Sequence, residues 1–132
     1  MYPSGSWRGW WEYGHRGRQP MHDLQLRFAG GLVEGEGRDV VGRFTFHGTY
    51  DDQGGVYLVK QYLRTEGIEE PGNAGHQVTY MGTYDGEGTI FGRWSIQEDR
   101  TSGPFALAPV RGWIDSDAAI EAEGHFVESE ES

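Results

Sequence analysis

The chain has 132 residues, a formal net charge of −10 and no cysteine. This length fits one domain with a single core, and the lack of cysteine excludes disulfide bonds and thiolate metal sites. No apolar run approaches the roughly 18 residues that a membrane helix needs. No basic, apolar leader follows Met1, so we expect no signal peptide, no membrane insertion and a cytoplasmic location.

The acidic charge is concentrated at the C-terminal end. Residues 115–132 contain seven Asp or Glu and no Lys or Arg, whereas residues 1–114 contain 14 acids against 11 bases. We therefore predict a single folded domain over residues 1–114 and an acidic C-terminal tail over residues 115–132. A nucleic-acid partner is not expected, because binding of that kind needs a basic surface.

An internal repeat defines the architecture. Residues 44–51 read Phe-Thr-Phe-His-Gly-Thr-Tyr-Asp, and residues 78–85 read Val-Thr-Tyr-Met-Gly-Thr-Tyr-Asp. In both copies a Gly-rich acidic turn and a second apolar segment follow. Each copy is typical of a β-hairpin, so the repeat predicts an antiparallel sheet built from successive hairpins.

Eight strands are predicted along the chain from alternating apolar and polar residues. The second strand shows the pattern clearly, with Leu24, Leu26 and Phe28 facing inward, and a Gly30-Gly31 turn follows it. The predicted strands are Ser6–Tyr13, Met21–Ala29, one beginning at Leu32, Gly42–Tyr50, Gly55–Arg64, Gln77–Tyr84, Thr89–Ile96 and Phe105–Ile114.

Eight consecutive antiparallel strands with short turns predict an all-β fold, an up-and-down barrel of about eight strands. Glycines among the inward aromatic residues favour closure, since small and bulky side chains alternate inside a tight barrel. These glycines are Gly9, Gly48, Gly82 and Gly92. A twisted β-sandwich would give the same local pattern and is the alternative.

Two short elements support a family resemblance. Gly5-Ser-Trp7 opens the first strand, and Arg111 lies late in the last one. In this respect the chain resembles the calycin-type barrels, the group that includes lipocalins and avidins. The resemblance implies a barrel over residues 5–114, with the guanidinium of Arg111 on the indole face of Trp7, and it points to ligand binding. No ligand-contacting residue is carried over from that group.

Aromatic residues at inward positions are the candidate binding residues. Such residues either fill a barrel core or line a cavity for a flat apolar ligand, with tyrosine hydroxyls as polar points. The predicted ligand-binding residues are Trp11, Phe46, Tyr50, Tyr80, Tyr84 and Trp94.

Ionisable residues give weaker signals. Lys60, the single lysine, is in phase with Val56 and Leu58; if these face inward, Lys60 approaches a barrel mouth and can meet a ligand carboxylate. The opposite phase is equally apolar. Asp51 and Asp85 end equivalent strands, either as paired carboxylates at one rim or, as we favour, as turn residues that bond nearby backbone amides. The five histidines show no metal-ligand spacing.

These observations predict a non-enzymatic barrel that binds a small hydrophobic or planar molecule, with no cofactor and no metal. The alternative is an interaction or structural module with a solid core, oligomeric through exposed aromatic residues such as Trp10, Tyr57 and Phe91. A third interpretation is a barrel enzyme of the isomerase or cyclase type. An internal cavity of roughly 300–1,000 Å³ would favour ligand binding, and a packed interior would favour the module. A cavity that contains an ionisable group would favour the enzyme.

Overall fold

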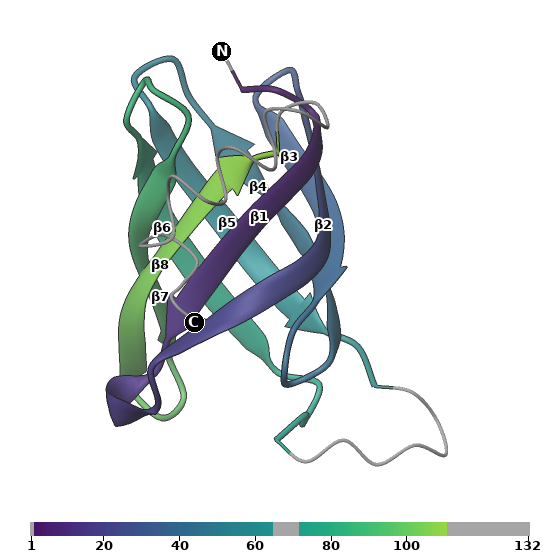
Figure 1. Ribbon diagram of the computed structural model, residues 1–132, viewed down its shortest axis with the longest axis vertical. Coiled ribbons are helices and arrows are strands. Elements are labelled where there is room, and N and C mark those ends of the chain that lie inside the picture. The colour runs from purple at the N-terminus through teal and green to yellow at the C-terminus, as the bar shows by residue number, and fades with distance from the viewer. Residues whose placement is uncertain (1, 65–71, 111–132) are drawn as a thin grey trace.

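Eight antiparallel strands close into a barrel in the computed structural model, which describes residues 2–64 and 72–110. Each strand pairs with the next, and the first pairs with the last (Figure 1). The elements are β1 (Gly5–Glu12), the 3-10 turn η1 (Gly14–Arg16), β2 (Arg18–Ala29), β3 (Leu32–Arg38), β4 (Arg43–Tyr50), β5 (Gly55–Tyr62), β6 (Gln77–Tyr84), β7 (Ile90–Ile96) and β8 (Thr101–Pro109). The predicted up-and-down barrel is confirmed, and a sandwich is excluded because no strand pair is left open.

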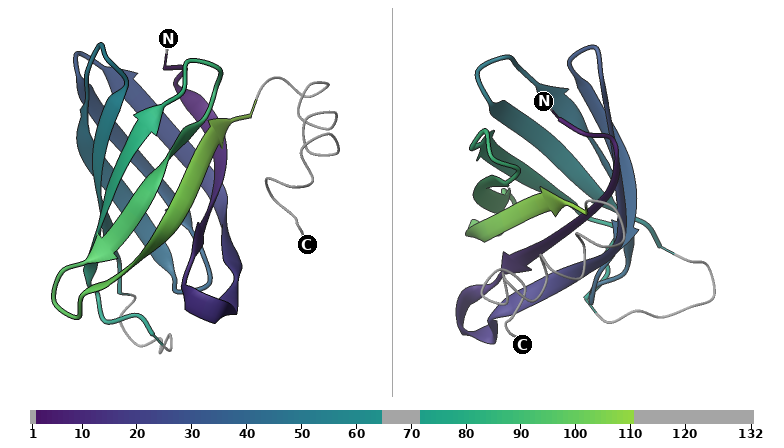
Figure 2. Two further views of the ribbon diagram at one scale, coloured as in Figure 1. Left: turned by 90° about the vertical axis from the view of Figure 1, so that its left-hand side faces the viewer. Right: turned by 45° about the horizontal axis from the view of Figure 1, so that its top comes forward.

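The strands run obliquely around the barrel axis (Figure 2), as closure of a twisted sheet requires. None of the helical segments in the described part of the chain has the length and apolar character of a membrane span.

The last strand begins earlier than the sequence predicted. β8 starts at Thr101, opposite Ile96, and includes Pro104, which precedes the predicted start at Phe105. Pairing of β8 with β1 begins only at Phe105, so the missing amide hydrogen of Pro104 removes no bond to β1. The predicted residues 111–114, Arg111 with its contact to Trp7, and the tail lie outside the described residues.

The two Asp residues of the repeat have the same role in their turns. Asp51 Oδ1 accepts hydrogen bonds from the amides of Gln53 (2.8 Å) and Gly55 (2.9 Å). Asp85 Oδ1 accepts them from the amides of Glu87 (2.7 Å) and Thr89 (3.1 Å). The turn interpretation of both residues is therefore confirmed, and equivalent sequence gives equivalent structure.

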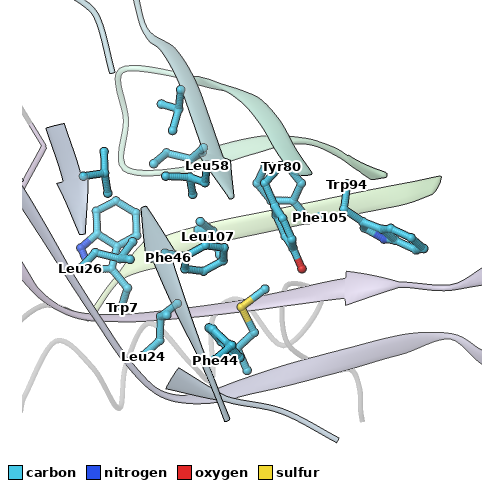
Figure 3. Packing of buried hydrophobic residues seen from close by; sticks show 14 of the residues in the cluster. Trp7, Leu24, Leu26, Phe44, Phe46, Leu58, Tyr80, Trp94, Phe105 and Leu107 are labelled. Atoms are coloured by element: carbon cyan, nitrogen blue, oxygen red, sulfur yellow. The ribbon is translucent and has the colours of Figure 1, made fainter. Parts of the chain in front are cut away.

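The interior follows the predicted phase of the strands. Val56, Leu58 and Lys60 on β5 are all buried, which settles the phase that the sequence left open. Phe44 and Phe46 on β4, with Leu24 and Leu26 on β2, fill the middle of the barrel (Figure 3).

One end of the barrel is closed by the N-terminal segment. The ring of Tyr2, 8% exposed, packs 5.1 Å from Phe28 and 4.7 Å from both Tyr50 and Tyr84, measured between ring centroids. Trp7 nearby donates from its indole Nε1 to the Pro3 carbonyl at 2.8 Å. The N-terminus and the turns that follow β2, β4 and β6 therefore form a sealed end, uppermost in Figure 1.

The repeat glycines sit where the barrel wall leaves no room for a side chain. A Cβ atom at Gly48 would overlap the Tyr57 carbonyl oxygen and lie 2.8 Å from the Cα of Leu58. At Gly82 it would lie 2.8 Å from the Phe91 carbonyl oxygen. These obstacles are backbone atoms, which cannot rotate away.

We expect Gly48→Val and Gly82→Val each to lower the free energy of unfolding by at least ~1–3 kcal/mol, with the larger loss at Gly48. Urea unfolding followed by tryptophan fluorescence measures both. Thr49→Val, on the exposed face of the same strand, is the control and should change stability by less than ~0.5 kcal/mol. Neutral glycine variants would show that the assigned strand phase is wrong.

Candidate functional site: an aromatic cavity beside a buried ion pair

The end of the barrel opposite Tyr2 is hollow. A cavity of about 340 Å³ opens there, between η1, the β3–β4 turn, the segment before β6 and the β7–β8 turn. This volume lies within the usual range of small-molecule sites, roughly 300–1,000 Å³. The wall is mostly aromatic and aliphatic, and it consists of Trp11, Tyr13, Arg16, Val41, Tyr62, Gly72, His76, Val78, Tyr80, Trp94, Ile96, Asp99 and Thr101.

Two other hollows of similar volume lie on the outer surface. One, of about 380 Å³, is lined mainly by charged residues such as Asp23, Arg38 and Arg43. The other, of about 410 Å³, lies over outward positions including Tyr57 and Ser95. Neither has a comparable aromatic wall, so the aromatic cavity is the better candidate for a small-molecule site.

The predicted binding residues divide between the two ends of the barrel. Trp11, Tyr80 and Trp94 line the cavity, and Trp11 meets Trp94 edge to face with ring centroids 6.0 Å apart. Phe46 is fully buried in the middle of the barrel, 5.2 Å from the ring of Tyr80. The other two, Tyr50 and Tyr84, pack around Tyr2 at the sealed end. The structure therefore brings three of the six together at the cavity.

A buried ion pair lies behind the cavity wall. The side chains of Lys60 and Asp39 are both 0% exposed, and Lys60 Nζ lies 2.5 Å from Asp39 Oδ2. Lys60 does not line the cavity, but the ring centroids of Tyr62 and Tyr80, which do, lie 4.8 Å and 5.3 Å from its Nζ. The prediction that Lys60 reaches a barrel mouth and meets a ligand carboxylate is therefore wrong, because the ammonium group is buried and its carboxylate partner is Asp39 of the same chain.

Asp39 is held by five donors. Its Oδ2 accepts from Lys60 Nζ, from the Tyr62 hydroxyl (2.7 Å) and from Trp11 Nε1 (3.0 Å). Its Oδ1 accepts from the amides of Val41 (2.9 Å) and Gly42 (3.3 Å) in the β3–β4 turn. A buried carboxylate is tolerated only when it is paired and hydrogen-bonded to this extent.

Lys60 is enclosed by aromatic rings. Its Nζ lies 4.3 Å from the ring centroid of Phe44, 4.8 Å from that of Tyr62, and 5.3 Å from those of Trp11 and Tyr80. Ring faces carry partial negative charge and stabilise a desolvated ammonium group. Nζ also donates to the Tyr80 hydroxyl at 3.1 Å, so the network connects the ion pair to the cavity wall.

Burial controls the protonation of this network. It lowers the pKa of Lys60 from 10.5 to about 8, although the charge of Asp39 and its hydrogen bond oppose the shift. Burial, together with the negative charge of Asp39, raises the pKa of Tyr62 and of Tyr80, so both hydroxyls stay protonated. At neutral pH the network holds one positive and one negative charge and is neutral overall.

The mouth of the cavity is polar. Arg16 and Asp99 lie at its rim, and hydrogen bonds from Thr101 lower the pKa of Asp99. The ring of His76 lies 4.9 Å from Tyr62, and its Nδ1 is buried without a hydrogen-bond partner among the described residues. No group of three or more His, Asp or Glu side chains in residues 2–64 and 72–110 is placed to hold a metal ion.

Sequence reasoning missed Asp39, Tyr62 and His76 as parts of this site. The single lysine on an inward strand phase was the available signal, because a buried ammonium requires an acidic partner. Which acid is the partner depends on the β3–β4 turn, whose conformation the sequence pattern does not predict.

Comparisons of the chain with protein-family models, with curated protein sequences and with solved structures give no significant match in any of the three. Function is therefore inferred from the geometry of the cavity alone.

Removing Lys60 should destabilise the barrel strongly. We expect Lys60→Met to lower the free energy of unfolding by ~3–5 kcal/mol, because it leaves the Asp39 carboxylate buried without a counter-charge. Urea unfolding measures the loss. Arg93→Met, which removes an exposed cation on β7, is the control and should cost less than ~1 kcal/mol. Equal effects of the two variants would contradict a buried pair.

Lys60 should also titrate far below an ordinary lysine. Because it is the only lysine, ¹³C-labelled lysine gives a single NMR signal, and its midpoint is expected at about pH 8 rather than 10.5. Asp39→Asn should lower that midpoint further, since Asp39 raises it. A midpoint near 10.5 would mean that the ammonium group is solvated.

The lowered pKa of Lys60 also determines how the free energy of unfolding changes with pH. Between pH 8 and 10.5 the unfolded chain keeps the Lys60 proton that the folded chain has released, so this group adds stability as pH rises through that interval. Above about pH 10 the opposite contribution begins, because tyrosines ionise in the unfolded chain while buried Tyr62 and Tyr80 do not.

Proposed function

We propose that this protein is a non-enzymatic, calycin-like barrel that binds one small planar, largely apolar molecule in the aromatic cavity. The observation that carries the proposal is the contrast between the two ends of the barrel. One end is filled by Tyr2 and its neighbours, whereas the other keeps a cavity of about 340 Å³ walled by Trp11, Tyr80 and Trp94. A domain that needed only a core would gain stability by filling this space.

The arrangement of charge supports binding rather than catalysis. Lys60, the one strongly perturbed cation in residues 2–64 and 72–110, is 0% exposed, and its ammonium group donates to Asp39 and to the Tyr80 hydroxyl. A general acid or base must reach its substrate directly or through one water. Here the cavity-facing groups next to the pair are ring faces and hydroxyls, which suit the recognition of a flat ligand.

The calycin resemblance fits this function in part. The chain order is that of an up-and-down barrel, and the Gly5-Ser-Trp7 element opens β1 with Trp7 buried at the sealed end. The basic residue that the resemblance places on this Trp, Arg111, lies outside the described residues.

A panel of planar apolar dyes tests the proposal by quenching of tryptophan fluorescence. We expect about one equivalent to bind per chain with roughly micromolar affinity, given ~25 cal/mol per Å² of buried apolar area less the costs of ordering. Trp94→Ala and Tyr80→Ala should weaken binding. Trp10→Ala is the control, because Trp10 faces outward beneath the guanidinium of Arg18, 4.0 Å from its ring.

Absence of binding across the panel would reject the cavity as a ligand site, and so would loss of binding in Trp10→Ala alone. The alternative function, an interaction module, would then be favoured. One observation supports that alternative: Tyr57, Met81 and Phe91 are 44%, 62% and 50% exposed on the neighbouring strands β5, β6 and β7. Sedimentation analysis of the chain would then be expected to show self-association.

A further inference from the structure

The hydroxyl group of Tyr80 has a hydrogen to donate and nothing in the network to receive it. Tyr80 is 1% exposed and lines the cavity, and its ring crosses the interior with the hydroxyl oxygen pointing away from its own strand (Figure 3). The oxygen accepts a hydrogen bond from Lys60 Nζ at 3.1 Å. This leaves the hydroxyl hydrogen itself to be placed.

Among the described residues the Tyr80 hydroxyl donates to none of the neighbouring acceptors, including the Tyr62 hydroxyl oxygen, which itself donates to Asp39. Asp39 Oδ2 accepts from Lys60, Tyr62 and Trp11, and Asp39 Oδ1 accepts from two backbone amides. The Lys60 ammonium has three donors and no lone pair. Within the part of the chain that the structure describes, the Tyr80 hydrogen therefore has no protein acceptor, and the space beside the ring is the cavity.

The ion pair makes this hydroxyl a strong and permanent donor. The hydrogen bond from Lys60 draws electron density from the Tyr80 oxygen and polarises its O–H bond. Burial and the charge of Asp39 raise the pKa of Tyr80, so the proton is not lost. A buried donor without an acceptor is unfavourable, and a ligand that supplies the acceptor removes that cost.

We propose that the ligand of this cavity is an uncharged planar molecule with a carbonyl-type acceptor at its inner end, which receives the hydrogen bond of the Tyr80 hydroxyl. This inference rests on the proposed function and specifies its ligand. An uncharged acceptor fits because the Lys60–Asp39 pair is already neutral, so a carboxylate at this depth would be a buried charge without a partner.

Two probes of the same shape test the hydrogen bond. 2-Acetylnaphthalene carries a ketone, and 2-isopropenylnaphthalene has a CH₂ group in place of the ketone oxygen. We expect the protein to bind the ketone roughly 2- to 12-fold more tightly, the range that one net hydrogen bond gives. Isothermal titration calorimetry or fluorescence quenching supplies both dissociation constants.

Tyr80→Phe removes only the hydroxyl group and should reduce this ratio to about one, while binding of the isopropenyl probe stays the same or strengthens. Tyr50→Phe is the matched control: Tyr50 packs against Tyr2 at the sealed end, so the ratio should keep its wild-type value. A ratio that persists in Tyr80→Phe, or a wild-type protein that binds both probes equally, overturns the inference and leaves the proposed function standing. If neither probe binds, both the proposed function and the inference fail.

A second measurement needs no variant. At pH 9.5, above the pKa of about 8 of Lys60, the neutral amine gains a lone pair that accepts the Tyr80 hydrogen, so the ratio should fall toward one relative to pH 7. Neither probe ionises in this interval. The titratable and charged groups facing Lys60 are Asp39, Tyr62 and Tyr80, beside the rings of Trp11 and Phe44. A ratio that is equal at both pH values contradicts the role of the ion pair.

Discussion

The buried pair of Lys60 and Asp39 is the constraint on which the cavity end of the barrel depends. Two charges without solvent must satisfy one another, and each requires further partners. Those partners come from β1, β4, β5, β6 and the β3–β4 turn, in the form of Trp11, Phe44, Tyr62, Tyr80 and two turn amides. Because Trp11, Tyr62 and Tyr80 also form part of the cavity wall, the pair fixes the position of the surface that a ligand would meet.

The strands could be predicted from the sequence because their signals are local. Alternation in β2 and β4, the acidic turns of the repeat and the inward glycines each depend on a few neighbouring residues, and all of them point to one antiparallel barrel. The site could be predicted only in part. Trp11, Tyr80 and Trp94 were recognisable as inward aromatics. The alternation of apolar and polar residues does not show where along the barrel axis a residue lies, so it could not place Tyr50 and Tyr84 at the opposite end. Asp39 lies 21 residues from Lys60, and the β3–β4 turn with the pairing of β3, β4 and β5 brings them together.

The two copies of the internal repeat are alike at the sealed end of the barrel and differ at the cavity end. The identical residues lead into turns at the sealed end; they are Gly48-Thr-Tyr-Asp51 and Gly82-Thr-Tyr-Asp85. In both copies the Asp accepts a hydrogen bond from a turn amide and the Tyr packs against Tyr2. The copies differ where their strands reach the cavity: Lys60 of the first copy corresponds to Trp94 of the second, and Phe44 corresponds to Val78. A duplicated hairpin thus supplies a common scaffold at one end and two different surfaces at the other.

Because Tyr2 and its aromatic neighbours close one end of the barrel, the interior is open only at the cavity end of the described structure. In the part of the chain that the structure describes, a molecule would enter and leave the aromatic cavity past Arg16, His76 and Asp99. Entry and escape are therefore governed by the same few side chains, and a change at this rim would alter the rates of both together. A ligand longer than the cavity would have to project from its mouth. A second macromolecule could then contact the projecting part without any opening of the barrel.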